Sequence, residues 1–409
     1  MTTDGVGGVW QYSLALARGL VARHGCAVAL VCVGEPPAGD LEDAIPGGGV
    51  ELFTLRLKLE WMPDSAGDVR EAVRQVAELA AAWRPDVVHS NQFCFGLLDV
   101  AAPRVVVAHS DLLGWMAWHR GWREPGPGPD PHARLRAERC AVGEATEERP
   151  TWSATELRPY RSLVAAGLAG AAAVVSPSRF MAESLARSYG RRSRVIYNGL
   201  WPDLYPSLPK ENVAVLVGRL WDEAKNAAVA ARATAGLPLE TWLVGPTVGP
   251  SGETALLPSA ANVRYTGRLT WAETRASIAR ARFYLAASSY EPFGLAALEA
   301  AFCGCAILAS DTPAHREIWE GAALFYHRDD DRALRRQLSA LLDAPEEAER
   351  LGRAARDRAL EMFTAERMAA EYHSLYTSIL EPHSTRPGRE SGSIAWGAAT
   401  LDVLAGPPK

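Results

Sequence analysis

The chain is poor in lysine, in paired cysteines and in long apolar runs. Only four of its 43 basic residues are lysines, so a lysine within a motif carries unusual weight. The six cysteines show neither zinc-ligand spacing nor a C-x-x-C pair, which argues against a zinc module and a redox site and predicts buried free thiols in a reducing compartment. No apolar run approaches 18 residues. These absences predict a cytoplasmic protein whose membrane contact is at most peripheral, at the inner face of the plasma membrane.

The charge balance argues against a nucleic-acid-binding protein. The 409 residues carry a formal net charge of −5, with 48% apolar and 22% charged residues, which is typical of a soluble globular protein. Neither half has the basic excess of a nucleic-acid-binding protein. The length exceeds one ordinary hydrophobic core and predicts two domains.

Short apolar runs alternate with segments of helical periodicity along most of the chain. The first half contains "CAVALVCV", "VELFTL", "DVVHS", "RVVVAHS", "AAVVS" and "RVIYN"; the second restarts with "VAVLVG", "TWLVG", "VRYTG", "FYLAA", "AILAS" and "AALFY". This pattern predicts an α/β protein of two tandem Rossmann-like, doubly wound domains. Ligands of such sheets bind beyond the carboxyl ends of the strands, so the expected site is a cleft between the two domains.

The predicted organisation has five parts. They are an N-terminal domain at 1–197 with an irregular insertion at 120–155, a linker at 198–212, a C-terminal domain at 213–362, a returning helix at 363–381 and a loose tail at 382–409. The chain opens on the glycine loop "MTTDGVGGVW" without an apolar strand before it. We therefore expect a truncated first strand and a natural start upstream.

The stretch "EPFGLAALE" holds the most informative carboxylates. Glu291 and Glu299 are eight residues apart, which along a helix is a rise of about 12 Å. That length suits the two sugars of a nucleotide-sugar, while the N–H groups of Phe293, Gly294 and Leu295 suit the phosphates between them. The alternative is a buried helix whose glutamates cap or pair locally.

A pair of cations strengthens the phosphate interpretation. Arg219 follows the predicted strand "VAVLVG" and Lys225 lies before the next helix. Two cations beside a helix N-terminus can neutralise a diphosphate and stabilise it as a leaving group. Solvated loop charges are the alternative, and the scarcity of lysine makes it less satisfactory for Lys225.

The segments "GRLWDEAKN", "YTGRLTWAE", "SSYEPFGLAALEAAFCGCAILASDTPAHREI" and "VIYNG" resemble the retaining glycosyltransferases of the GT-B fold, family 4. The resemblance runs from residue 1 to about 381. It implies that Arg219 and Lys225 contact the donor diphosphate, that Glu299 contacts the ribose, and that Glu291 lies near the donor sugar. It also implies transfer without a metal or other cofactor.

The resemblance extends to the first half of the chain. It implies that Gly7 and Gly8 face the diphosphate and the acceptor and that His109, at the end of "VVVAH", contacts the donor sugar. Trp115 and Trp118 follow in "DLLGWMAWHRGW", on one helical face with Trp122. They could line an acceptor site, where a glycan, a lipid and a small natural product all remain open, or pack in the core. Neither the donor nucleotide nor the oligomeric state is readable from the sequence.

Two rival interpretations apply to the same fold. A nucleotide-sugar epimerase of the same fold usually lacks this combination of Glu-x7-Glu with the Arg–Lys pair. A non-catalytic sugar-nucleotide-binding or partner subunit is the more serious rival, since a missing central strand would leave backbone groups unpaired. The presence of all the donor-side residues favours an active enzyme.

Overall fold

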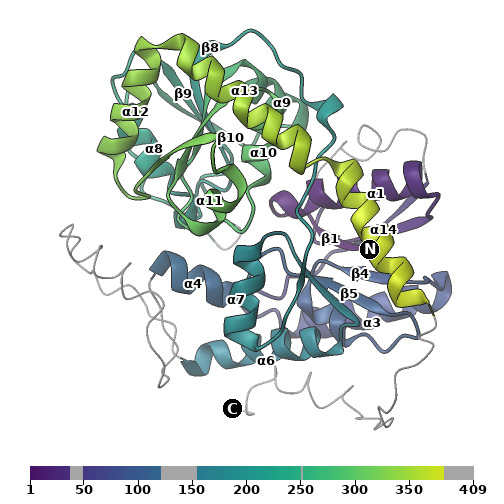
Figure 1. Ribbon diagram of the computed structural model, residues 1–409. Coiled ribbons are helices and arrows are strands. Elements are labelled where there is room, and N and C mark those ends of the chain that lie inside the picture. Colours follow the sequence, from purple (N-terminus) through teal and green to yellow (C-terminus); the bar gives the residue numbers. More distant parts are fainter. Residues whose placement is uncertain (37–48, 121–153, 250–251, 382–409) are drawn as a thin grey trace.

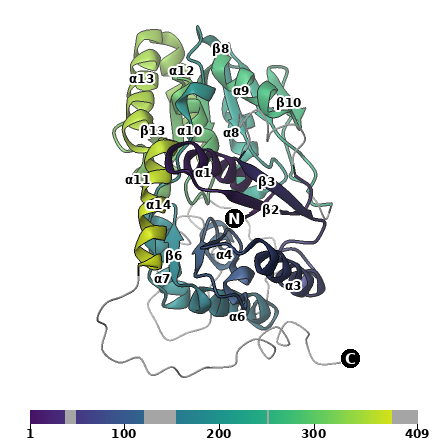
Figure 2. The same ribbon diagram turned by 90° about the vertical axis from the view of Figure 1, so that its right-hand side faces the viewer.

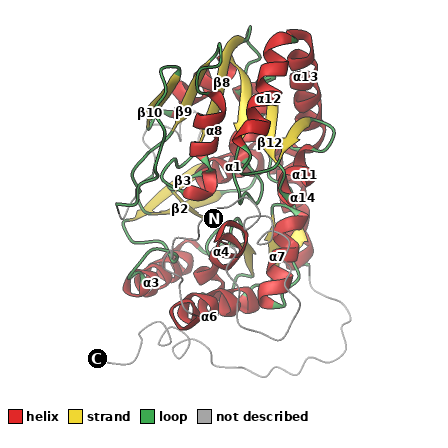
Figure 3. Ribbon diagram, turned by 90° about the vertical axis from the view of Figure 1, so that its left-hand side faces the viewer, coloured by secondary structure: helices red, strands yellow, loops and turns green. Residues whose placement is uncertain are grey.

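The computed structural model describes residues 1–36, 49–120, 154–249 and 252–381. They form two α/β domains, one above the other in Figure 1, and the predicted fold class is confirmed. The predicted insertion falls almost wholly outside the described residues, as do Trp122 and the tail. Helices and strands alternate through both domains, as Figure 3 shows by colour.

The first domain contains two parallel sheets. One has the order β1-β2-β3 and the other β4-β5-β6-β7. The strands are β1 Thr2–Asp4, β2 Val28–Val33, β3 Val50–Leu55, β4 Val88–Ser90, β5 Arg104–Val107, β6 Ala173–Ser176 and β7 Arg194–Val195. The helices are α1 Gly8–His24, α3 Ala66–Trp83, the 3-10 helix η1 Phe93–Leu97, α4 Leu112–Arg120, α6 Ala154–Gly170 and α7 Arg179–Tyr189.

The expectation that no strand precedes the glycine loop is wrong. Strand β1 pairs in parallel with β2, with Thr2 opposite Val31 and Asp4 opposite Val33. All three residues of β1 are buried although none is apolar, which explains why the sequence pattern does not reveal the strand. Hydrogen bonds replace apolar packing: the hydroxyl of Thr2 donates to Oε1 of Gln92 over 2.6 Å.

The second domain is built on one parallel sheet of order β10-β9-β8-β11-β12-β13. Its strands are β8 Glu211–Val217, β9 Glu240–Val244, β10 Val263–Gly267, β11 Ala281–Ala286, β12 Ala306–Ser310 and β13 Ala323–Tyr326. Its helices are η2 Pro202–Leu204 in the connection, η3 Glu223–Lys225, α8 Ala227–Thr234, α9 Trp271–Arg280, α10 Leu295–Phe302, α11 Pro313–Trp319, α12 Asp331–Asp343 and α13 Pro345–Met362. Every one of the predicted apolar runs contains a strand, because strands of a parallel sheet covered on both faces read as continuous apolar segments.

Helix α14 (Ala365–Leu380) leaves the second domain and lies along α1 of the first (Figures 1 and 2). The two helices approach closely at Gly19, where a Cβ atom would lie 2.5 Å from Cβ of Ala369. A larger residue at Gly19 would push the helices apart. This packing ties the two domains together away from the strand ends.

No helix in the described part of the chain is long and apolar enough to span a membrane. The same residues contain no group of three or more His, Cys, Asp or Glu side chains that could hold a metal ion.

Candidate functional site

The candidate site lies at the point where the strand order of the second domain's sheet reverses. Strands β8 and β11 are neighbours, and the chain runs outward from them to opposite edges of the sheet. Such a reversal opens a crevice at the carboxyl ends of the two strands. Arg219 and Lys225 follow β8, and Glu291 follows β11, so residues distant in sequence come together here.

Lys225 and Glu291 form an ion pair at this crevice. Nζ of Lys225 donates to Oε2 of Glu291 over 2.6 Å, with side chains that are 19% and 18% exposed. Ser288 adds a hydroxyl 3.2 Å from the same oxygen. Burial alone would raise the pKa of Glu291, but the charge and hydrogen bond of Lys225 outweigh it and hold the pKa below its ordinary value. Glu291 is therefore ionised at neutral pH.

Arg219 is fixed by a buried carboxylate. Its Nη2 donates to Oδ2 of Asp222 over 2.8 Å, while Asp222 also accepts from the N–H of Ala224. The guanidinium of Arg219 lies 5.5 Å from the centre of the Trp221 ring. The Arg219 side chain remains 33% exposed, so part of this cation faces solvent and can meet a ligand. Asp222 was missed in the sequence because Asp is a common helix-capping residue.

The turn before α10 differs from the sequence-based geometry. The helix begins only at Leu295, so Glu291 lies on a loop and the separation of the two glutamates does not follow from helical rise. Gly294 has φ of 90°, in the left-handed region, and a Cβ there would lie 3.3 Å from Cγ of Glu291. The side chain of Phe293 is buried against Phe363, so only its backbone can meet a ligand.

Glu299 lies deeper, on α10. It is 6% exposed, and the hydroxyl of Tyr205 donates to its Oε1 over 3.3 Å. Burial raises the pKa of Glu299 to about 7, against the opposing effects of Tyr205 and Arg275. A carboxyl with this pKa can accept or donate a hydrogen bond near neutral pH. Nothing in the sequence motif indicated Tyr205.

The glycine loop of the first domain lies directly against Arg219 and Leu295 of the second. Gly7 has φ of 87°, and a Cβ there would lie 3.8 Å from Nη1 of Arg219. A Cβ on Gly8 would lie 3.0 Å from Cδ1 of Leu295. The two domains thus meet at the point where the sequence predicted a shared site, and the absence of side chains on the loop permits the approach.

His109 follows β5 and is half-buried. Its Nε2 lies 2.8 Å from Oδ1 of Asn91, which follows β4. The ring of Tyr12 packs edge-on against it, with centroids 4.4 Å apart. Removal of the ring from water lowers the pKa of His109 to about 3, so it is neutral. Asn91 carried no sequence signal, because one Asn after a strand is common.

Asp4 is another residue that the sequence analysis missed. It ends β1, accepts a hydrogen bond from the N–H of Val6 over 2.9 Å and lies 3.4 Å from Nε2 of Gln92. Burial raises the pKa of Asp4 to about 6, although the Val6 hydrogen bond and the charge of Arg219 oppose the shift. The carboxyl of Asp4, just before the glycine loop, therefore titrates near neutral pH.

Trp115 and Trp118 lie on α4 at the boundary between the domains. Both pack against an apolar cluster of Phe180, Tyr290, Ala224 and Ala314, which joins residues of the two domains. The rings of Trp118 and Phe180 meet edge-on with centroids 5.2 Å apart. Both tryptophans remain partly exposed. Packing between the domains therefore buries part of each tryptophan ring.

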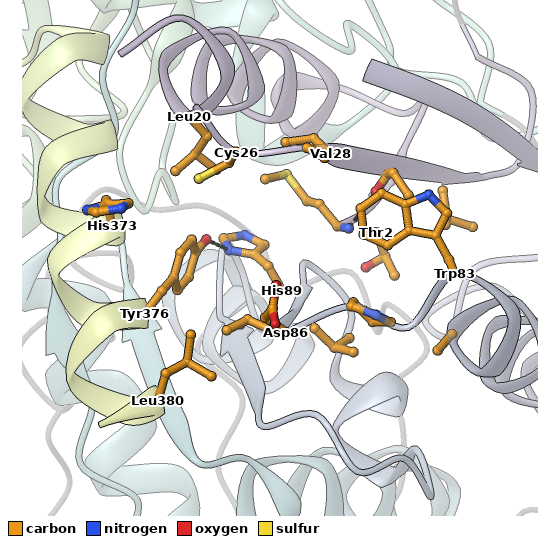
Figure 4. A pocket seen from close by; sticks show the side chains of 18 of the residues that line it. Thr2, Leu20, Cys26, Val28, Trp83, Asp86, His89, His373, Tyr376 and Leu380 are labelled. Atoms are coloured by element: carbon orange, nitrogen blue, oxygen red, sulfur yellow. Dashed lines mark hydrogen bonds between the residues drawn. The ribbon is translucent and has the colours of Figure 1, made fainter. Parts of the chain in front are cut away.

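One cavity, of about 430 Å³, lies elsewhere, between β2, α3, β4 and α14 (Figure 4). Its walls are mostly apolar and include Val28, Trp83, His89, Tyr376 and Leu380. None of the residues predicted from the sequence to form the site lines it. The cavity is separate from the crevice beside Arg219 and Lys225.

Two protein-family models together match almost the whole described chain. Residues 6–204 match the model of Glycosyltransferase Family 4, and residues 205–358 match that of Glycosyl transferases group 1. Alpha-maltose-1-phosphate synthase of Mycobacterium tuberculosis is 31% identical over 120 residues, which are 27% of this chain and 31% of that protein. The match thus spans about a third of the curated relative.

Solved structures share the fold over most of the chain. Sucrose-phosphate synthase from Thermosynechococcus elongatus superposes with a TM-score of 0.69 at 19% identity, covering 92% of this chain and 98% of the other. Anabaena HepE, solved in complex with UDP and glucose, gives a TM-score of 0.63 at 17% identity and covers 92% and 99%. With the two matching family models, these likenesses place the chain in family 4 of the glycosyltransferases, with the GT-B fold.

Proposed function

We propose that this glycosyltransferase moves a sugar from a nucleoside diphosphate sugar to an acceptor hydroxyl, with retention of configuration. The observation that carries the proposal is the meeting of Arg219, the Lys225–Glu291 pair and the glycine loop at one crevice. A diphosphate there would find two cations and bare backbone within reach of each other.

The chemical step needs no protein nucleophile. The bond between the anomeric carbon and the phosphate oxygen breaks, and the acceptor oxygen forms a bond to that carbon on the same face. The proton of the acceptor hydroxyl passes to the departing phosphate oxygen, giving a glycoside and a nucleoside diphosphate. Arg219 and Lys225 stabilise the negative charge that develops on the diphosphate, and catalysis rests on this charge and on positioning.

Transfer without a metal ion is part of the proposal. Arg219 and Lys225 supply the positive charge beside the diphosphate. When a diphosphate binds, Nζ of Lys225 can contact it while keeping its contact with Glu291, because an ammonium group has three donors. Glu291 then serves both to orient Lys225 and to accept a hydrogen bond from a sugar hydroxyl.

The remaining residues are assigned by their positions. Glu299 is proposed to bind the ribose, with Tyr205 holding one of its oxygens. The backbone N–H groups of Phe293, Gly294 and Leu295 are proposed to bind phosphate at the start of α10. Trp115 and Trp118 are proposed to border the acceptor, a glycan, lipid or small natural product. We also propose that the protein acts in the cytoplasm.

The donor class can be tested by thermal shift with UDP, GDP, ADP and dTDP. UDP is the first choice because HepE was solved with it. We expect one nucleotide to stabilise the wild-type protein and both Lys225→Ala and Glu299→Ala to abolish the shift. Lys58→Ala and Glu361→Ala are matched controls, since both side chains are exposed and lie outside the site.

A folded wild-type protein that responds to none of the four nucleotides would contradict the proposal. That result would favour a partner subunit without sugar-nucleotide binding. A shift without turnover would favour the non-catalytic binding protein. The presence of β1, paired with β2, removes the main structural reason for either alternative, because the strand before the glycine loop is there.

A further inference from the structure

A chain of buried and partly buried hydrogen bonds runs from α14 to His109. The hydroxyl of Tyr376 lies 2.6 Å from Nδ1 of His89 (Figure 4), and Nε2 of His89 lies 3.2 Å from Oδ1 of Asn91. The same oxygen of Asn91 lies 2.8 Å from Nε2 of His109. Because α14 leaves the second domain, this chain connects a helix of one domain to a site residue of the other.

The orientation of the Asn91 amide is fixed by its other side. Nδ2 of Asn91 lies 2.7 Å from the backbone carbonyl oxygen of Thr2 and 3.0 Å from the hydroxyl of Ser13. A carbonyl oxygen can only accept, so the group facing Thr2 must be the NH₂. The oxygen of Asn91 therefore faces the two histidines, and it can only accept from them.

This orientation determines where each imidazole carries its proton. Both His89 and His109 contact the Asn91 oxygen through Nε2, and its two lone pairs serve two donors, so both rings donate from Nε2. The hydroxyl of Tyr12, 3.4 Å from Nε2 of His89, then accepts from the same N–H. Burial lowers the pKa of each ring to about 3, so each has one N–H only. Nδ1 of His89 then accepts from Tyr376, and Nδ1 of His109 is an acceptor without a partner in the described residues.

We propose that Asn91 is a positioning residue that holds His109 as the Nε2–H tautomer, so that its Nδ1 accepts a hydrogen bond from a hydroxyl of the bound donor sugar, while Tyr376 supports the same tautomer in His89. The sugar hydroxyl as ligand rests on the proposed function, whereas the tautomer of His109 does not. The edge-on ring of Tyr12 restricts rotation of the imidazole, so the acceptor stays aimed in one direction.

The tautomer can be measured directly in the ligand-free protein. Long-range ¹⁵N–¹H correlation of the histidine rings, with His109→Gln for assignment, should report a protonated Nε2 and a bare Nδ1 on His109 at pH 7. Asn91→Leu should give a mixture of tautomers at His109, and Tyr376→Phe a mixture at His89. Leu380→Ala is the matched control on the same helix and cavity wall, and it should change neither ring. A protonated Nδ1 on wild-type His109 would overturn the inference.

Binding of the sugar is tested by calorimetry with UDP and UDP-glucose as probes. Asn91→Leu should weaken UDP-glucose about fivefold, the loss expected for one hydrogen bond, and leave UDP within about twofold. Equal loss for both probes would mean a merely structural role and would overturn the inference. If Asn91→Leu does not fold, Asn91→Ala serves with the same probes and the same expected losses. Failure of the wild-type protein to bind either probe would count against the proposed uridine donor, and the tautomer spectrum would then decide on the positioning role alone.

Discussion

The ion pair of Lys225 and Glu291 should make a large and pH-dependent contribution to stability. Removing one partner of a fully buried pair costs about 3–5 kcal/mol, whereas exposed pairs contribute about 0–1 kcal/mol. These side chains are about one fifth exposed, and the Ser288 hydroxyl still contacts the carboxylate when the lysine is gone. We therefore expect Lys225→Met to lower the free energy of unfolding by about 2 kcal/mol at pH 8, intermediate between those limits.

The sign of the pH dependence follows from the pKa of Glu291. In the native pair this pKa is lowered, so its stabilising contribution is present above the unfolded-state pKa and is lost as the pH falls through the folded-state pKa. Without Lys225, burial raises the pKa of Glu291, and the carboxyl becomes neutral at a higher pH. The deficit of the variant should therefore shrink as the pH is lowered from 8 to 5.

Urea unfolding at several pH values measures both effects, and a double-mutant cycle isolates the pair. Lys225→Met with Glu291→Gln should recover much of the lost stability, because no unpaired charge remains buried. Equal stability of the single and double variants, or a deficit of the same size at pH 5 and pH 8, would refute this account.

Two further predictions concern other buried or interdomain carboxylates. The pKa of Glu299, raised to about 7, implies stability that is complete below the unfolded-state pKa and lost as the pH rises to about 7. Urea titrations should therefore show Glu299→Gln gaining up to about 3 kcal/mol over the wild type between pH 4 and pH 8, and a constant difference would contradict the buried state of this carboxyl. Glu317 on α11 accepts from the N–H groups of Arg179 and Phe180 at the start of α7, over 2.7 and 2.9 Å. Glu317→Ala should cost about 1–2 kcal/mol and speed hydrogen exchange at these two amides, whereas unchanged exchange would show that the interdomain cap is unimportant.

The sequence alone determined the architecture, for a physical reason. Strands buried on both faces need continuous apolar residues, so all the predicted runs are strands, and their alternation with helical segments indicates parallel sheets. The candidate site residues could be located in the same way, because Arg219 follows β8, Lys225 precedes α8 and Glu291 lies in the loop between β11 and α10, where ligands of such sheets bind.

Strand β1 shows where sequence patterns fail. Thr2, Thr3 and Asp4 lack the apolar character of a buried strand, and hydrogen bonds across the fold, such as those of Thr2 and Asp4 with Gln92, offset the cost of their burial. The same limit applies to the glutamates of "EPFGLAALE", whose separation depends on where α10 begins rather than on their spacing.

The tertiary structure also decided which polar groups meet. Lys225 and Glu291 are paired across 66 residues, and Tyr376 reaches His89 across 287, so no local pattern could reveal either contact. Asn91 looks unremarkable in the sequence, yet its amide orients two histidines because Thr2 fixes its other side. Local sequence thus specified each element and the residues at its end, while long-range packing specified the partners, protonation and direction of the side chains in the site.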